Sequence, residues 1–180
     1  MKENKTILES KKLLVNWKDC YGWAPDSAAN KMNEGMLEWM SSLTDCLDIW
    51  QEKGLNITNG ELILGYANLG DLVECWLIFF LCIFYEDYIK NPIFNNGRIN
   101  EPNKLKYETL KNFCRDKLWK DNEQIDYFVE QVQKRRNAIH SFNKKDIGTP
   151  FEYYEMLNYY IDFLDCVINH LPDEPDREYY

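Results

Sequence analysis

The sequence predicts an all-α protein, an up-down bundle of five or six helices. Apolar residues recur every three or four positions in successive segments, which is the spacing of one face of a helix. Three segments begin with Thr followed three positions later by Glu, at Thr6, Thr58 and Thr149, and this is the pattern of a helix capping box. No stretch of useful length alternates apolar and polar residues as half-buried strands do.

The first half of the chain predicts three helices, over residues 6–21, 26–53 and 58–89. The apolar stripe of the second helix consists of Met32, Met36, Met40, Leu43, Leu47 and Trp50. In the third helix, Gly65 and Gly70 predict either a kink or the close approach of another helix.

The second half predicts a loop and three further helices. Residues 91–103 are rich in Pro, Gly and Asn, as loops are. Helices are expected over residues 105–119, 122–140 and 149–171, so that the middle one continues to His140.

Size and composition indicate a single domain over residues 1–172, followed by an acidic tail over residues 173–180. The formal net charge of −9 means that the surface as a whole repels nucleic acid, so a polyanion would need a local basic patch. The six cysteines lie far apart, and the first residues lack the apolar segment of a signal peptide. We therefore expect reduced cysteines in a cytoplasmic protein. With two histidines and no metal-ligand spacing, we expect no metal and no cofactor.

The most apolar run covers residues 72–85 and contains Glu74. It is shorter than the roughly 20 residues needed to cross a bilayer, so we expect a buried helix and no membrane span. Glu74 can lie at the edge of the core, pair with an arginine, or act as an acid facing the basic segment described next.

The segment QKRRNAIHSF, residues 133–142, carries the candidate chemistry. His140 is one of two histidines, and an imidazole can take and return a proton near neutral pH. Arg135 or Arg136 can neutralise a phosphate, and Asn137 can position it. These groups suit RNA cleavage without a metal, in which a base deprotonates the ribose 2′-OH and that oxygen attacks the adjacent phosphate.

The same residues also suit an ordinary helix C-terminus, where basic side chains interact favourably with the helix dipole. On a continuous helix Arg136 and His140 share a face, about 40° apart, whereas Arg135 lies about 140° from His140. If the helix unwinds before His140, Arg135 can be its neighbour instead. The residues alone leave both assignments open.

An all-α chain with R-x4-H late in the sequence, here Arg135 and His140, resembles the HEPN superfamily (higher eukaryotes and prokaryotes nucleotide-binding). The resemblance implies a homodimer in which two motifs face each other and form one RNase site. It implies RNA as the substrate and, because many members are toxins or phage-defence effectors, an antitoxin or defence protein as a further partner. The motif spacing favours Arg135 as the catalytic arginine, with Arg136 as a phosphate contact.

The chain departs from the family pattern at two positions. Arg136 follows Arg135, where the family usually has Asn, Asp or His. Phe142 stands where some toxin-type members have the tyrosine of an H-x-Tyr sequence. The chain therefore lacks the hydroxyl that a partner antitoxin could modify there.

Lysines surround the motif at Lys134, Lys144 and Lys145, and such a basic surface would bind a phosphate backbone in a salt-dependent way. A second basic group, within residues 111–120, is equally typical of a solvated helix face.

Three functions follow from these patterns. The favoured one is a metal-independent endoribonuclease with Arg135, Asn137 and His140 as catalytic residues. The alternative is a non-catalytic HEPN-like module that binds RNA, a nucleotide or a partner protein. The third is a helical adaptor in which the basic segment only ends a helix.

Overall fold

Helices dominate the described part of the chain, which comprises residues 1, 4–140 and 144–172 of the computed structural model. Within these residues there are eight α-helices and one hairpin of two short strands, so the predicted all-α helical bundle is confirmed. The predicted acidic tail, Ser141 and Phe142 lie outside the described residues.

The α-helices are α1 (Lys5–Lys18), α2 (Asp26–Glu34), α3 (Leu37–Lys53), α4 (Asn59–Ile83), α5 (Tyr85–Tyr88), α6 (Tyr107–Leu118), α7 (Glu123–Arg136) and α8 (Pro150–Ile168). The 3-10 turns are η1 (Gly54–Asn56), η2 (Pro102–Lys104) and η3 (Asn137–Ile139). The hairpin pairs β1 (Phe94–Asn95) with β2 (Arg98–Ile99) in antiparallel register.

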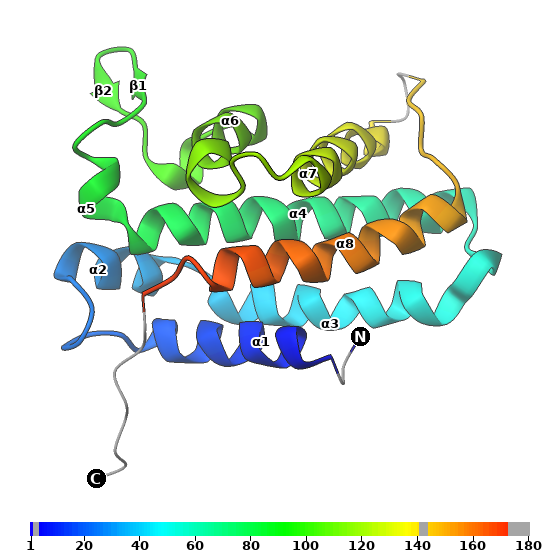
Figure 1. Cartoon of the computed structure of the whole chain (residues 1–180), viewed down its shortest axis with the longest axis horizontal. Coiled ribbons are helices and arrows are strands. Elements are labelled where there is room, and N and C mark those ends of the chain that lie inside the picture. Colours follow the sequence, from blue (N-terminus) through cyan, green and yellow to red (C-terminus); the bar gives the residue numbers. More distant parts are fainter. Residues whose placement is uncertain (2–3, 141–143, 173–180) are drawn as a thin grey trace, which may run out of the picture.

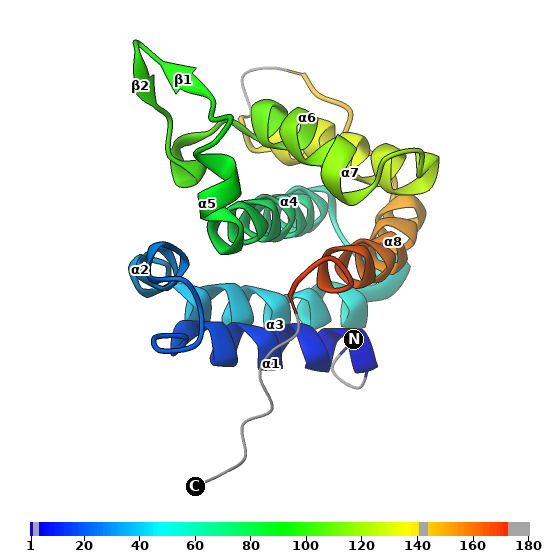
Figure 2. The same cartoon turned by 60° about the vertical axis from the view of Figure 1, so that its left-hand side comes forward.

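Helix α4 runs through the middle of the bundle, as Figure 1 shows. Helices α3 and α1 lie on one side of it, α6 and α7 on the opposite side, and α8 packs against α1, α4 and α7 (Figures 1 and 2). By length and composition α4 could cross a membrane, but 67% of its most apolar window is buried inside the bundle. A core helix has the same composition, so the apolar run serves here as the core of the fold.

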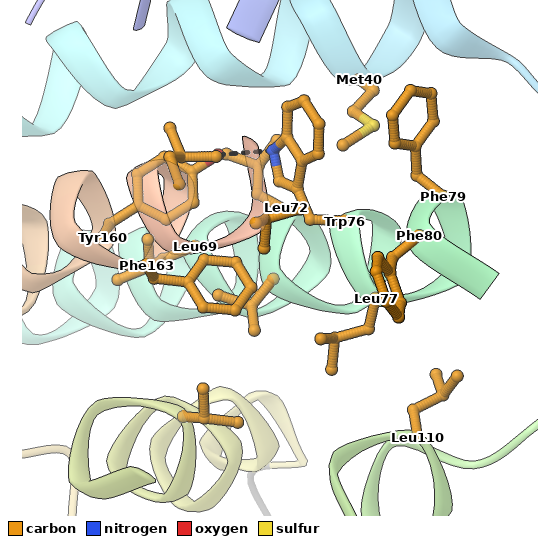
Figure 3. Close-up of a cluster of buried hydrophobic side chains, with 14 of the residues drawn as sticks. Met40, Leu69, Leu72, Trp76, Leu77, Phe79, Phe80, Leu110, Tyr160 and Phe163 are labelled. Atoms are coloured by element: carbon orange, nitrogen blue, oxygen red, sulfur yellow. Dashed lines mark hydrogen bonds between the residues drawn. The ribbon is translucent and has the colours of Figure 1, made fainter. Parts of the chain in front are cut away.

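The core gathers around the α4 side chains Leu69, Leu72, Trp76 and Leu77, all of them fully buried (Figure 3). The indole Nε1 of Trp76 donates to the hydroxyl of Tyr160 on α8 at 3.1 Å, which satisfies two polar groups inside the core. Side chains from α3 and α6 converge on the same cluster (Figure 3).

Two of the α4 glycines, Gly65 and Gly70, mark the close approach of other helices. A Cβ atom at Gly65 would lie 2.8 Å from Cζ of Tyr153 on α8, and one at Gly70 would lie 2.6 Å from Cδ of Arg136 on α7. The expected close approach is confirmed at both positions, and α4 continues through them without interruption.

The helix boundaries differ from expectation at the N-terminal half. The single helix expected over residues 26–53 is divided at Gly35, which is extended (φ −80°, ψ 149°), so Met36 leaves the stripe and is 56% exposed. The third helix ends at Ile83 and not near residue 89, and a separate short helix follows. These two breaks turn the five or six expected helices into eight.

Capping was predicted correctly at two of three sites. Thr58 and Thr149 form the expected capping boxes at the starts of α4 and α8. At α1 the prediction was wrong, because the Asn4 side chain accepts from the backbone N–H groups of Thr6 and Ile7. Asn is an equally good N-cap, and its position two residues earlier gives α1 an additional starting residue.

Candidate functional site

Helix α7 ends at Arg136 and continues as the tighter turn η3, so of the two geometries that the sequence left open, the helix that unwinds before His140 is the one observed. The last turn of α7 directs its two arginines to different neighbours. Arg135 contacts residues of α4 and α8, and Arg136 contacts residues of α4 and α6. Both guanidinium groups therefore point into the bundle.

Arg135 is 4% exposed and connects three helices. Its Nη1 donates to the Tyr66 hydroxyl at 2.6 Å, and its Nη2 donates to Oε1 of Glu152 at 2.7 Å. The other carboxylate oxygen of Glu152 accepts from the Thr149 N–H at 2.7 Å in the capping box of α8. One carboxylate thus caps α8 and binds α7, which fixes both ends of the segment that carries His140.

The backbone is shaped around this arginine at Gly148. Its φ of +68° favours glycine, and a Cβ atom there would lie 2.6 Å from Cζ of Arg135. Only glycine fits this position without displacement of the guanidinium group.

Burial and hydrogen bonding keep the three groups in fixed ionisation states. Burial raises the pKa of Tyr66 to about 12, against the opposing effect of Arg135. The hydrogen bond from Thr149, and then the one from Arg135, lowers the pKa of the Glu152 carboxyl. At neutral pH the contact therefore joins a guanidinium, a carboxylate and a neutral phenol.

Arg136 binds the surface of α4. Its Nη1 donates to the Gly70 carbonyl at 3.2 Å and to the Glu74 carboxylate, and its guanidinium lies 4.7 Å from the centre of the Tyr107 ring. Glu74 is thus a partner of the basic segment through Arg136, one of the roles that the sequence left open. The half-buried pair explains why a carboxylate interrupts the most apolar helix.

His140 and Asn137 face outward from the same turn. The His140 side chain is exposed, and its backbone N–H donates to the Asn137 carbonyl at 3.4 Å. The Asn137 amide donates to the Gln133 carbonyl at 3.0 Å. Within the described residues no hydrogen bond joins the imidazole to either arginine. The structure therefore joins His140 and Asn137 through the backbone of one turn, while the two neighbouring guanidinium groups donate to residues of α4 and α8.

The basic side chains near the turn differ in environment. Lys134 pairs with Glu130 at 3.1 Å, whereas Lys144 and Lys145 are exposed and have no ion pair with any described residue. Lys111, which sequence reasoning treated as part of a surface group, is 4% exposed and lies 2.9 Å from Glu108 and 3.1 Å from Glu130. A helical period around buried Leu110 and Cys114 was the signal that could have placed it inward.

A polar hollow of about 720 Å³ lies between α6, α7 and the segment after Lys144. We call it the α6–α7 hollow. Lys134, Arg135, Asn137 and Lys145 of the predicted site line it, and His140 does not.

No group of three or more His, Cys, Asp or Glu side chains capable of holding a metal occurs among the described residues. Comparisons with protein-family models, curated proteins and solved structures find no match to this chain.

Proposed function

We propose that this chain is a metal-independent endoribonuclease of HEPN type, in which two copies of the turn Asn137–His140 form one site in a homodimer. The observation that carries the proposal is the exposed imidazole on a short turn, held from behind by the buried Arg135 and the half-buried Arg136. An imidazole that faces solvent is accessible for proton transfer to a bound strand. A role in phage defence or in a toxin–antitoxin pair belongs to the same proposal and rests on the resemblance alone.

The chemistry needs two proton transfers. One imidazole removes the proton of the ribose 2′-OH, whose oxygen forms a new bond to the adjacent phosphorus. The bond from phosphorus to the 5′-oxygen breaks, and a second, protonated imidazole supplies the proton that this oxygen takes. Because each turn contains one histidine, the second imidazole comes from the second copy. Asn137 and the exposed Lys144 and Lys145 are positioned on the same segment to contact the phosphate.

The proposal is tested with purified protein and a labelled RNA in EDTA. We expect fragments with a 2′,3′-cyclic phosphate and a 5′-hydroxyl, the products of attack by the 2′-oxygen. The same strand with 2′-O-methyl groups throughout should stay intact, because it has no nucleophile. Full-length RNA after prolonged incubation, or products with a 5′-phosphate, would contradict the proposed reaction.

An apolar groove of about 230 Å³ between α2, α3 and α4 is the surface that we propose for the second copy. Trp39 and Met36 line it and are 66% and 56% exposed, although side chains of this kind are usually covered. Asp71 and Cys75 of α4 also line the groove. They directly follow Gly70 and Glu74, the two residues that accept hydrogen bonds from Arg136. Asp71 and Cys75 therefore lie about 100° around α4 from the two residues that bind Arg136.

Trp39→Glu is expected to convert a dimer into a monomer in sedimentation equilibrium. Loss of a central aromatic anchor typically weakens an interface about 30-fold or more. Cleavage should fall in parallel, because each copy supplies one imidazole. Leu55→Glu is the matched control, since Leu55 is 67% exposed in η1 and lies outside the groove. A Trp39→Glu protein that is still dimeric would remove the groove from the proposal.

A second candidate function is RNA binding without cleavage, and the arginine contacts favour it. Both guanidinium groups already have a carboxylate partner, Glu152 for Arg135 and Glu74 for Arg136. The charge that develops on a phosphate would then be stabilised by lysines alone. RNA that binds and is recovered intact in EDTA would support this second function.

A further inference from the structure

The α6–α7 hollow has the size of a ligand site and an unusual lining for an acidic protein. Its volume of about 720 Å³ is within the range of small-molecule and cofactor pockets, roughly 300–1,000 Å³. Its cationic lining consists of Lys111, Arg115, Lys134, Arg135 and Lys145. Three carboxylates line it, those of Glu108, Glu130 and Asp146. Cations thus exceed carboxylates here, in a chain whose formal net charge is −9.

Four of the five cations in the lining already have a carboxylate partner, and those of Arg115 and Arg135 are Asp126 and Glu152, outside the lining. The Glu130 carboxylate is shared, with one oxygen 3.1 Å from Lys134 and the other 3.1 Å from Lys111. Lys145 is exposed and has no ion pair with a described residue. Nε of the buried Arg135 has no hydrogen-bond partner in the described part of the chain. This Nε lies beside Gly148 and has less than 1 Å² of exposed surface, so an anion in the hollow does not reach it.

The basic residues within 111–120 differ in whether they line the hollow. Arg115 and the buried Lys111 line it. Lys117 and Lys120 are exposed and do not line it, and the Lys117 ammonium lies 4.0 Å from the centre of the Phe113 ring. Helix α6 and the turn after it therefore provide both candidate ligand contacts and exposed lysines that serve as controls.

We propose that the α6–α7 hollow binds the phosphodiester backbone of the RNA strand and leads it to His140. This inference rests on the proposed function and extends it by assigning the substrate groove and what the groove recognises. Asn137 lines the hollow, and its carbonyl accepts from the His140 N–H, so the groove and the imidazole are joined by one short turn. A strand held by its phosphates in the hollow would pass directly to the exposed histidine.

The lining also determines which part of an RNA strand the hollow recognises. Among its residues there are amide and charged side chains and no Phe, Tyr, Trp or His, so no ring is available on which a base could stack. Base stacking on aromatic side chains is the usual source of affinity for the bases of single strands. The hollow therefore recognises phosphate and sugar, with little preference for base sequence and a strong dependence on salt.

The test measures binding of a fluorescent, mixed-sequence 12-nucleotide RNA in the His140→Ala background, so that the strand is not cut. Lys134→Glu with Lys145→Glu is expected to weaken binding at least tenfold and to lower the salt dependence, since each lost phosphate contact reduces the slope by about 0.7 for single strands. The matched control, Lys117→Glu with Lys120→Glu, changes the net charge equally and is expected to weaken binding less than threefold. Lys145→Ala repeats the test with a single exposed residue.

The outcomes separate this inference from the proposed function. Equal weakening by the two charge-reversed pairs, or no weakening by either, would overturn the hollow as the binding site. A preference above tenfold among poly(A), poly(U) and poly(C) strands would overturn backbone recognition. The unmodified protein, which retains His140, could bind RNA strongly at the hollow and not cleave it. That result would support the hollow as the binding site and refute the proposed nuclease activity. Cleavage that is unaffected by the Lys134 and Lys145 changes would overturn the hollow as the substrate groove and leave the proposed nuclease standing.

Discussion

His140→Ala is expected to reduce the rate of RNA cleavage at least about a hundredfold, the lower end of what positioned acid–base catalysis contributes. The free energy of unfolding should change by less than about 0.5 kcal/mol, as for other surface substitutions. The reason is the exposure of the side chain, which makes no hydrogen bond to a described residue. Single-turnover cleavage assays and thermal unfolding measure the two quantities separately.

His170→Ala provides the control with the same chemical change. His170 is exposed after the end of α8, and its Nδ1 lies 2.7 Å from the Cys166 carbonyl. We expect unchanged cleavage, because this histidine lies away from the turn and from the α6–α7 hollow. Cleavage that survives His140→Ala, or that is lost equally in both variants, would remove His140 from the reaction.

Much of the fold could be predicted because its signals are local. The capping boxes at Thr58 and Thr149 lie within four residues, and both form as expected. The periodic apolar stripes gave the helical segments and the central apolar helix. Periodicity tolerates a short break, however, so the two non-helical residues between α2 and α3, Gly35 and Met36, left no trace in the apolar spacing.

The candidate site was less predictable because its contacts are distant in sequence. The motif spacing located the turn, and the unwinding of α7 at Asn137 decides between the two helical geometries that the residues left open. Arg135 binds Tyr66, 69 residues away, and Glu152, 17 residues away. The buried stripe of α7, Phe128, Val129 and Val132, reaches Arg135 at helical spacing, and this was the local signal that could have placed its side chain inward. A short motif names the residue types present but not the direction in which each side chain points.

Arg135→Ala is expected to lower the free energy of unfolding by about 3 kcal/mol, the lower end of the cost of breaking a buried ion pair. The lower end applies because Glu152 has 37% of its side chain exposed and would regain solvent, whereas Tyr66 would be left buried without this partner. Chemical denaturation measures the loss. Arg98→Ala, on an exposed hairpin strand, should stay within about 0.5 kcal/mol of the unmodified protein.

A double-mutant cycle with Glu152→Gln shows which role Arg135 has. Glutamine can still complete the capping box with Thr149, so this variant removes the charge from the partner of Arg135 and retains the cap. We expect a coupling energy of about 1–2 kcal/mol between the two positions, within the range for residues in one ion-pair network. A stable Arg135→Ala protein that has lost cleavage and shows no coupling to Glu152 would instead place this guanidinium on the RNA. The inward direction of Arg135 argues for the first result, in which the arginine positions the turn and His140 performs the proton transfer.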